Sequence, residues 1–279
     1  IFQRFGLYPP PPNASPLLGL EVSGIIIEIG DEVKNFKIGD EICALLNGGG
    51  YAQYAIAEEG VCFKKPKMLT FIEAASIPET IMTVYENVFN SCGLKTGQNF
   101  LVHGGASGIG VMAIQMAKAI GAKIFTTVGS DEKANFCQSL GADITINYAS
   151  MDFEKVIREN GGVDVILDMV GGPYIQKNIN ILNEGGNLCY IAFLQGANTQ
   201  INFMRLMLKR LNITGSTLRS RSDEDKALIA NGVKNDFWPY IENGQIKPII
   251  DSVFRFEDVQ AAHDLMQSNK HIGKIILEI

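Results

Sequence analysis

The sequence predicts an α/β protein in which a doubly wound parallel sheet lies between two parts of a β-rich region. Short apolar runs alternate with segments of helical periodicity between residues 99 and 218, which is typical of right-handed βαβ units. A glycine-rich turn lies where the first of these strands gives way to a helix. The first eighty residues instead hold short β-rich segments separated by Gly-Asp turns.

The alternating region contains six candidate strands. They are expected at Asn99–His103, Ala122–Val128, Ile144–Tyr148, Val163–Val170, Leu188–Phe193 and Ile213–Leu218. Helices are expected at Ile109–Ile120, Asp131–Leu140 and Asp152–Asn160. Gly121 and Gly141 follow two of these helices, at a position that favours glycine. Val163–Val170 is apolar almost throughout, as expected of a strand buried on both faces.

The flanking segments predict fewer and shorter elements. Before the alternating region, the β-rich segments are Gly24–Ile29 and Glu41–Leu45. After it, Asp225–Glu242 and Glu257–Ser268 have helical spacing, and Lys274–Ile279 resembles a final strand. We therefore expect the flanks to form one domain that the doubly wound domain interrupts.

Composition excludes several classes of protein. The 279 residues include 30 acidic and 24 basic side chains, a formal charge of −6 without the basic patch of a nucleic-acid binder. No run reaches the roughly 18 apolar residues of a membrane span. Five scattered cysteines without a CxxC pair indicate reduced thiols in a compartment such as the cytoplasm, and no structural zinc. Because the chain begins with Ile1, we expect its natural N-terminus, with any targeting signal, to lie upstream.

The glycine-rich turn predicts a dinucleotide site. The segment Gly105-Ala106-Ser107-Gly108-Ile109-Gly110 lies between a strand and a helix. Glycine there permits a tight turn, close approach of the backbone to a pyrophosphate and close packing of helix on strand, and the helix N-terminus supplies free N–H groups. The alternative is a plain strand-to-helix turn, which the further βα units make less favoured.

The end of the second strand distinguishes the two nicotinamide dinucleotides. An NAD site needs a carboxylate for the ribose 2′-hydroxyl, whereas an NADP site needs cations around the 2′-phosphate. The strand ends in Gly129 and Ser130, and Lys133 follows on the first helical turn, so we favour NADPH. In the alternative, Ser130 only caps the helix, Lys133 is a solvated charge, and Asp131 binds the ribose of NAD.

Several motifs resemble one family along the whole chain. They are Tyr8-Pro9-Pro10-Pro11, Gly19-Leu20-Glu21-Val22-Ser23-Gly24, Gly39-Asp40, Gly49-Gly50-Tyr51-Ala52-Gln53-Tyr54, Ala74-Ala75-Ser76-Ile77-Pro78, the segment from His103 to Gly110, and His271-Ile272-Gly273-Lys274. The chain resembles the zinc-free quinone oxidoreductases of the medium-chain dehydrogenase/reductase superfamily, especially their tumour-suppressor-induced branch, with zeta-crystallin more distant. The resemblance implies a homodimer that reduces quinones with NADPH. It also implies an N-terminally incomplete GroES-like catalytic domain (1–80 and 217–279) interrupted by a Rossmann NADP-binding domain (81–216).

The resemblance also implies roles for individual residues. Gly129, Lys133 and Tyr148 match the spacing of residues that hold a 2′-phosphate. Tyr8 and Ser107 match residues that border the nicotinamide, although Tyr8 could instead pack on the proline run and Ser107 could be a small residue of a tight turn. Other cofactor-lining candidates, each of which could equally be structural, are Thr83, Gly172, Phe193 and Lys274.

The residues that bind zinc in related dehydrogenases are missing here. Those relatives resemble this chain but carry Gly-His-Glu, where this sequence has Leu20 in place of the histidine, and they have a four-cysteine lobe that is absent. We expect no metal, and therefore a substrate that is already electrophilic, such as a quinone or an enone. His103 ends a strand and is better interpreted as a polar core residue than as a base.

Three functions remain open at this stage. The first is NADPH-dependent quinone reduction by hydride transfer from nicotinamide C4, in which the protein orients the reactants. The second is reduction of an enone or a 2-enoyl thioester with the same geometry. The third is a crystallin-like protein that binds NADPH with little catalysis.

Overall fold

The computed structural model describes residues 3–6, 10–12 and 14–279 and divides the chain into two compact units. The first unit consists of Ile1–Thr83 and Leu218–Ile279, and the second of Val84–Thr217. The chain therefore leaves the first unit, forms the second and returns. Within the described residues, no helix combines the length and the apolar character needed to cross a bilayer.

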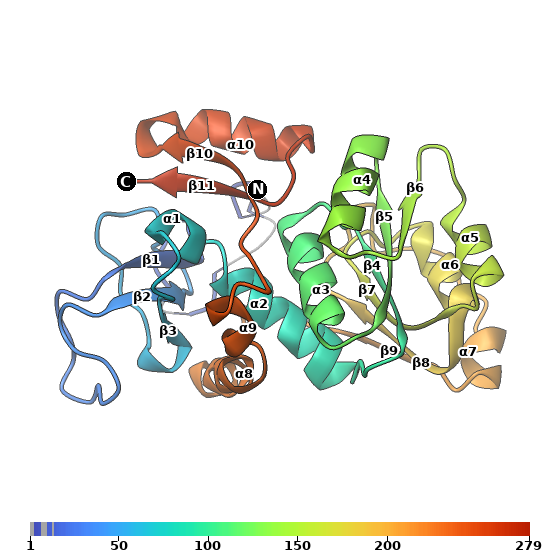
Figure 1. The fold of residues 1–279 in the computed structure, drawn as a ribbon, viewed down its shortest axis with the longest axis horizontal. Coiled ribbons are helices and arrows are strands. Elements are labelled where there is room, and N and C mark those ends of the chain that lie inside the picture. The colour runs from blue at the N-terminus through green and yellow to red at the C-terminus, as the bar shows by residue number, and fades with distance from the viewer. Residues whose placement is uncertain (1–2, 7–9, 13) are drawn as a thin grey trace. The chain divides into compact units, whose positions relative to one another are not determined.

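The second unit is built on one parallel six-stranded sheet (Figure 1). Its strands are β4 (Asn99–His103), β5 (Lys123–Val128), β6 (Ile144–Asn147), β7 (Val163–Asp168), β8 (Leu182–Tyr190) and β9 (Asn212–Gly215). Its α-helices are α3 (Gly108–Ala119), α4 (Asp131–Leu140), α5 (Phe153–Glu159), α6 (Tyr174–Ile181) and α7 (Met204–Leu208). A π-helix, η2 (Tyr85–Ser91), precedes β4.

The strand order confirms the predicted doubly wound sheet. The strands follow the order β6-β5-β4-β7-β8-β9, and all neighbours are parallel. Helix α3 packs on α4, whereas α5, α6 and α7 form a second group of neighbours. The chain thus winds first to one side of β4 and then to the other. The carboxyl edge between β4 and β7 is the topological switch point, where such folds bind ligands.

A dry core explains why these segments form a sheet. The strands contribute Leu101, Phe125, Ile146 and Ile166, whose side chains have no solvent exposure. Full burial of such a side chain contributes about 1.5–3 kcal/mol. The core therefore fixes the strands, and the polar connections at their carboxyl ends remain available for a ligand.

The first unit combines two small sheets with several helices. Strands β1 (Glu21–Ile25), β2 (Glu41–Leu45) and β3 (Cys62–Lys64) form an antiparallel sheet, and β10 (Ile250–Arg255) pairs with β11 (Lys274–Glu278) in parallel. Its helices are α1 (Phe71–Ala74), α2 (Pro78–Val84), α8 (Asp223–Asp236), α9 (Trp238–Glu242) and α10 (Val259–Ser268), with the short 3₁₀ helices η1 (Glu59–Val61) and η3 (Phe256–Asp258).

Several predicted boundaries were wrong. The helix expected over 225–242 is two helices, because Pro239 has no N–H group and begins a new helix in its first turn. The strand expected at Leu188–Phe193 ends at Tyr190, so Phe193 lies in the following loop. The strand expected at Gly24–Ile29 runs from Glu21 to Ile25. Helix α6 and strand β10 were missed.

Candidate active site

The glycine-rich turn joins β4 to α3 at the carboxyl edge of the sheet. Gly104 has a φ of 72°, which favours glycine. Ser107 is the N-cap of α3, and its Oγ accepts a hydrogen bond from the N–H of Gly110 at 3.0 Å. Among the residues that the structure describes, the N–H groups of Gly108 and Ile109 have no protein acceptor. Such a helix terminus favours a bound phosphate.

Two glycines of the turn are required by close packing. A Cβ atom on Gly105 would lie 2.0 Å from Oγ1 of Thr126 on the neighbouring strand. A Cβ atom on Gly110 would lie 2.3 Å from the carbonyl oxygen of Gly104. Ala106, which follows Gly105 in the sequence, is also buried. The backbone of the turn is therefore packed tightly against the sheet, as a pyrophosphate cradle requires.

The connection that follows β7 lies beside this turn. Oγ of Ser107 is 3.8 Å from Sδ of Met169. The N–H of Gly172 donates to the carbonyl oxygen of Gly196 at 2.8 Å, which joins this connection to the loop after β8. In that loop Phe193 is 42% exposed and stacks on Tyr190 with ring centroids 4.9 Å apart. The switch point therefore brings together the glycine-rich turn, Gly172 and Phe193.

The end of β5 brings Gly129 and Tyr148 together. A Cβ atom on Gly129 would lie 2.6 Å from the hydroxyl oxygen of Tyr148, which is 45% exposed. Ser130 is the N-cap of α4 and accepts from the N–H of Lys133 at 3.3 Å. Ser130 thus has the capping role of the alternative interpretation, and Lys133 lies on the first turn of the same helix. A residue larger than glycine at position 129 would displace the Tyr148 hydroxyl.

Asp131, the acid that could select NAD, is engaged by a neighbouring side chain. Its Oδ1 accepts a hydrogen bond from Nδ2 of Asn147 at 2.7 Å. Asn147 is the last residue of β6 and directly precedes Tyr148. The carboxylate is therefore held toward the β6 side of this edge.

His103 belongs to a buried hydrogen-bond network behind the turn. Its Nδ1 lies 2.9 Å from Oγ1 of Thr127, and its Nε2 lies 2.8 Å from Oδ1 of Asn178. Nδ2 of Asn178 donates to Asp168 at 2.8 Å, and Asp168 also accepts from the N–H of Val170 at 2.5 Å. Because the amide oxygen only accepts, Nε2 carries the proton. Burial lowers the pKa of His103, so the ring is a neutral structural link.

The remaining predicted residues lie in the first unit or outside the described residues. Thr83 is buried near the end of α2. Nζ of Lys274, at the start of β11, forms an ion pair with Glu21 of β1. Tyr8 lies outside the described residues, so its role stays a prediction. The structure thus assembles the second-unit candidates at one sheet edge and gives Lys274 a protein partner.

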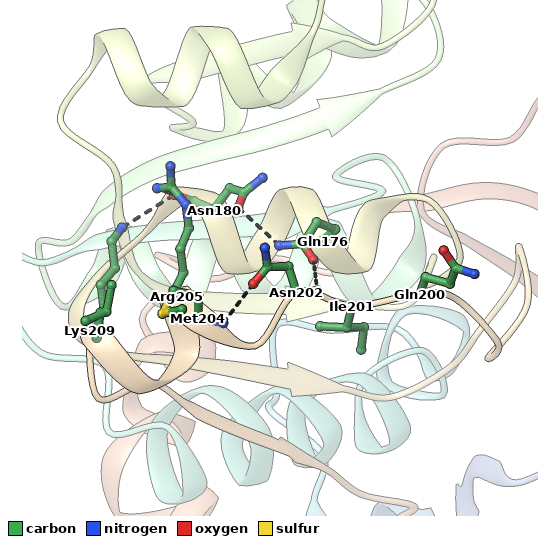
Figure 2. Close-up of a pocket in the computed structure, with 9 residues that line it drawn as sticks. Gln176, Asn180, Gln200, Ile201, Asn202, Met204, Arg205 and Lys209 are labelled. Carbon is green, nitrogen blue, oxygen red and sulfur yellow. Dashed lines mark hydrogen bonds between the residues drawn. The ribbon is translucent and has the colours of Figure 1, made fainter.

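One pocket of the second unit contains none of the predicted residues. It has a volume of about 780 Å³. Its lining residues, drawn in Figure 2, are Gln176, Asn180, Gln200, Ile201, Asn202, Met204, Arg205, Leu208 and Lys209. Arg205 and Lys209 both donate to the backbone carbonyl of Asn180, each at 3.4 Å, near the end of α6. Cations at a helix C-terminus stabilise it, so these two side chains have a structural explanation.

Known proteins match the chain along most of its length. The family described as "Alcohol dehydrogenase GroES-like domain" matches residues 2–67, and "Zinc-binding dehydrogenase" matches residues 108–231. Human quinone oxidoreductase is 31% identical over 279 residues, which cover 98% of this chain and 83% of that protein. Tomato (Solanum lycopersicum) 2-methylene-furan-3-one reductase is 32% identical, covering 93% of this chain and 62% of that protein. The structure of Escherichia coli quinone oxidoreductase complexed with NADPH has 29% identity and a TM-score of 0.88, covering 100% of this chain and 86% of that one.

The chain belongs to the quinone oxidoreductase family of the medium-chain dehydrogenases/reductases. It is therefore an oxidoreductase with a doubly wound nucleotide-binding fold and a GroES-like domain, as the sequence predicts. The family resemblance that the motifs indicate is likewise confirmed.

The described residues of this family member do not fit a zinc ion, although one matched family is described as zinc-binding. Among them, no three His, Cys, Asp or Glu side chains form a group able to hold a metal. Glu21, next to Leu20, is instead paired with Lys274. Burial raises the pKa of the Cys62 thiol to about 11 and also raises that of Cys43, which disfavours the thiolate that binds zinc.

Two groups of residues near these sites were missed by sequence reasoning. Asn178 and Asp168 hold His103, but only the fold brings α6 beside β4 and β7. Glu79 lies beside Glu21 and Thr83, and its N–H donates to Oε2 of Glu21 at 3.0 Å. The sequence did contain a signal for Glu79, since this acid directly follows the family motif that ends at Pro78.

Proposed function

We propose that this oxidoreductase reduces quinones with NADPH. The observation that carries the proposal is the assembly of the glycine-rich turn, Gly172 and Phe193 at the switch point of the sheet. The chain is also similar to quinone oxidoreductases along nearly its whole length. When bound, NADPH would supply a hydride from nicotinamide C4 to the substrate.

Residues at the end of β5 support NADPH as the cofactor. The two backbone N–H groups at the start of α3 would bind the pyrophosphate. Lys133 and the hydroxyl of Tyr148, over Gly129, would hold the 2′-phosphate, since a cation and a hydroxyl donor match its charge and its oxygens. Asp131 is held by Asn147, so its charge would lie to the side of that phosphate.

The protein's part in the reaction is orientation and hydrogen bonding. Reduction of a quinone places negative charge on an oxygen atom, which a hydroxyl donor stabilises. We assign that role to Tyr8 and Ser107. Ser107 already uses an oxygen lone pair to accept from Gly110, and this leaves its O–H group to donate to an oxygen ligand in place of the weak acceptor Met169. A quinone fits a site without a Lewis acid because it is already electrophilic.

The proposal is tested by mixing the protein with NADPH and 1,2-naphthoquinone and following the absorbance of NADPH. We expect oxidation that depends on the quinone and on protein concentration. The variant Gly24→Ala is a control, because a Cβ atom there meets no atom within 4 Å. A wild-type protein that binds NADPH but leaves it unoxidised with the quinone would falsify the proposal.

A second function is favoured by one relative. The tomato protein is named as a reductase of a 2-methylene-furan-3-one, a compound with a carbon–carbon double bond conjugated to a ketone. The same hydride geometry would reduce an enone or a 2-enoyl thioester, provided that a proton reaches the α-carbon. Turnover of crotonyl thioester faster than that of the quinone would support this alternative. Tight binding of NADPH without turnover of either compound would favour the third function, a crystallin-like binding protein.

We also propose the assembly and surroundings of the protein. Strand β9 is exposed at the edge of the sheet, and Met204, Met207 and Leu208 of α7 are more than half exposed, which supports a homodimer. The five cysteines are all buried free thiols, which supports a reducing compartment such as the cytoplasm. The bounds 1–80, 81–216 and 217–279 stay our proposal for the two domains.

A further inference from the structure

The pocket drawn in Figure 2 has a surplus of positive charge. Arg205 and Lys209 line it, and among the described residues neither takes part in an ion pair. Burial lowers the pKa of Lys209, and the positive charges of Arg205 and Arg158 lower it further. Glu154, which accepts from Nδ2 of Asn180 at 3.1 Å, is already paired with Arg158 at 2.6 Å. A bound anion would relieve this repulsion between cations.

The amide side chains of the pocket already use their oxygens as acceptors. Backbone N–H groups only donate, so the bond from the N–H of Asn202 at 2.6 Å identifies Oε1 of Gln176. In the same way, the bond from the N–H of Met204 at 2.9 Å identifies Oδ1 of Asn202 (Figure 2). Nε2 of Gln176 then donates to Oδ1 of Asn180 at 3.2 Å. Within the described part of the chain, Nδ2 of Asn202 is left without an acceptor.

The hydrogen bonds to the end of α6 also leave donors over on both cations. Arg205 donates to the carbonyl oxygen of Asn180, and Lys209 donates to the carbonyl oxygens of Asn180 and Leu182. A guanidinium group and an ammonium group each carry more N–H donors than these bonds use, and the rest have no acceptor among the residues that the structure describes. The pocket thus combines positive charge with spare donors, which is the arrangement that binds an oxyanion.

The cationic end of this pocket lies away from the candidate cofactor site. Leu182 is the first residue of β8, whereas the glycine-rich turn follows the last residue of β4. Both strands belong to one parallel sheet, so the cations lie at its amino edge and the turn at its carboxyl edge. Ile201, Met204 and Leu208 add an apolar wall, beside the surface that we propose for the homodimer. A ligand here needs an anionic group and can carry an apolar body.

We propose that this pocket is a second binding site, which takes the phosphate group of a small organic molecule. Arg205 and Lys209 would bind the phosphate oxygens, Nδ2 of Asn202 would donate to the same group, and the apolar wall would contact the organic part. A phosphate ester carries about −1.5 to −2 charges at neutral pH, which matches two cations better than a carboxylate does. The site requires neither the nicotinamide cofactor nor the proposed reaction.

The test is isothermal titration calorimetry with phenyl phosphate, inorganic phosphate and benzoate at constant ionic strength. We expect phenyl phosphate to bind the wild-type protein more tightly than either of the other two. Arg205→Met should weaken that binding at least about tenfold, since it removes a charge-assisted donor. Lys155→Met removes the same charge from an exposed lysine outside the pocket and should leave the affinity unchanged. Phosphate held at the start of α3 would be common to all variants, so it does not imitate this difference.

A second variant keeps the test decisive if Arg205→Met does not fold. Asn202→Asp keeps the oxygen that accepts from the N–H of Met204 but replaces the amide donor with a negative oxygen, so it should also weaken binding at least about tenfold. A wild-type protein that does not bind phenyl phosphate, or an affinity that is unchanged in folded Arg205→Met or Asn202→Asp, overturns the inference. An equal loss in Lys155→Met, or tighter binding of benzoate than of phenyl phosphate, also overturns it. Because no titration contains NADPH or a quinone, each of these outcomes leaves the proposed function intact.

Discussion

The buried network around His103 yields a quantitative prediction for the variant Asn178→Leu. The substitution removes hydrogen bonds of 2.8 Å to His103 and 2.8 Å to Asp168, both of which are fully buried. A buried polar group left without its partner costs about 1–3 kcal/mol. Asp168 keeps the hydrogen bond from the N–H of Val170, so the cost at Asp168 lies at the lower end of this range. We expect the free energy of unfolding of the second unit to fall by about 3 kcal/mol.

The assay is urea unfolding followed by far-UV circular dichroism. Fluorescence is unsuitable, because the single tryptophan, Trp238, belongs to the first unit. Asn198→Leu, in an exposed loop of the second unit, is the matched control and should stay within about 0.5 kcal/mol of wild type. The free energy of unfolding of the double variant His103→Leu with Asn178→Leu should fall by less than the sum of the two single decreases, because both hydrogen-bond partners are removed together. Full additivity, or an Asn178→Leu loss below about 0.5 kcal/mol, would refute the network.

Three further predictions concern the turn, the cap and pH. Gly110→Ala should weaken NADPH binding at least tenfold, because its Cβ would lie 2.3 Å from the carbonyl oxygen of Gly104 in the turn. Isothermal titration calorimetry measures the affinity, and an unchanged affinity would contradict the close packing of the turn. Ser130→Ala should lower stability by about 1 kcal/mol in urea unfolding, and Ser130→Gly by only a few tenths, whereas equal losses would exclude capping. Burial lowers the pKa of His103 below its ordinary 6.5, so the unfolded chain binds the proton more strongly than the folded protein. The wild-type protein therefore loses stability as the pH falls from 7 to 5, and His103→Leu should reduce that loss. Identical pH dependence of the urea midpoint in variant and wild type would contradict that assignment.

The sheet was predictable because its signals are local. Val163–Val170 is apolar apart from Asp164 and Asp168, and strand β7 is buried along nearly its whole length. The helix expected at Asp131–Leu140 is found with those bounds, since Ser130 caps its start and Gly141 adopts the left-handed conformation at its end. A capping residue and a terminal glycine are contained in the sequence itself.

Other elements were missed because their signals conflict with their structure. The first half of strand β8 is polar after Leu182 and contains Gly185 and Gly186, so it lacks the apolar run that predicts a buried strand. Helix α6 is rich in Asn and Gln, and its buried Asn178 is explained only by His103 and Asp168 across the fold. Tertiary partners, not local preference, stabilise such segments.

The candidate site shows the same division. The glycine-rich turn and the Gly129–Tyr148 pair follow from motif and spacing, and the structure gives both a steric reason. The capping role of Ser130 was foreseen as an alternative and is observed. The cluster of Glu79, Glu21 and Thr83 joins a strand to a helix far away in the sequence, so spacing alone did not reveal it.

The most direct test of the account compares kcat/KM for NADPH and NADH with the same quinone, in the wild-type protein and in Lys133→Met. A charge-assisted hydrogen bond to the 2′-phosphate corresponds to at least about tenfold in kcat/KM. We predict that the wild type prefers NADPH by at least that factor and that Lys133→Met loses most of the preference without losing activity with NADH. A wild-type protein that uses NADH equally well, or a variant that keeps the full preference for NADPH, would contradict the account.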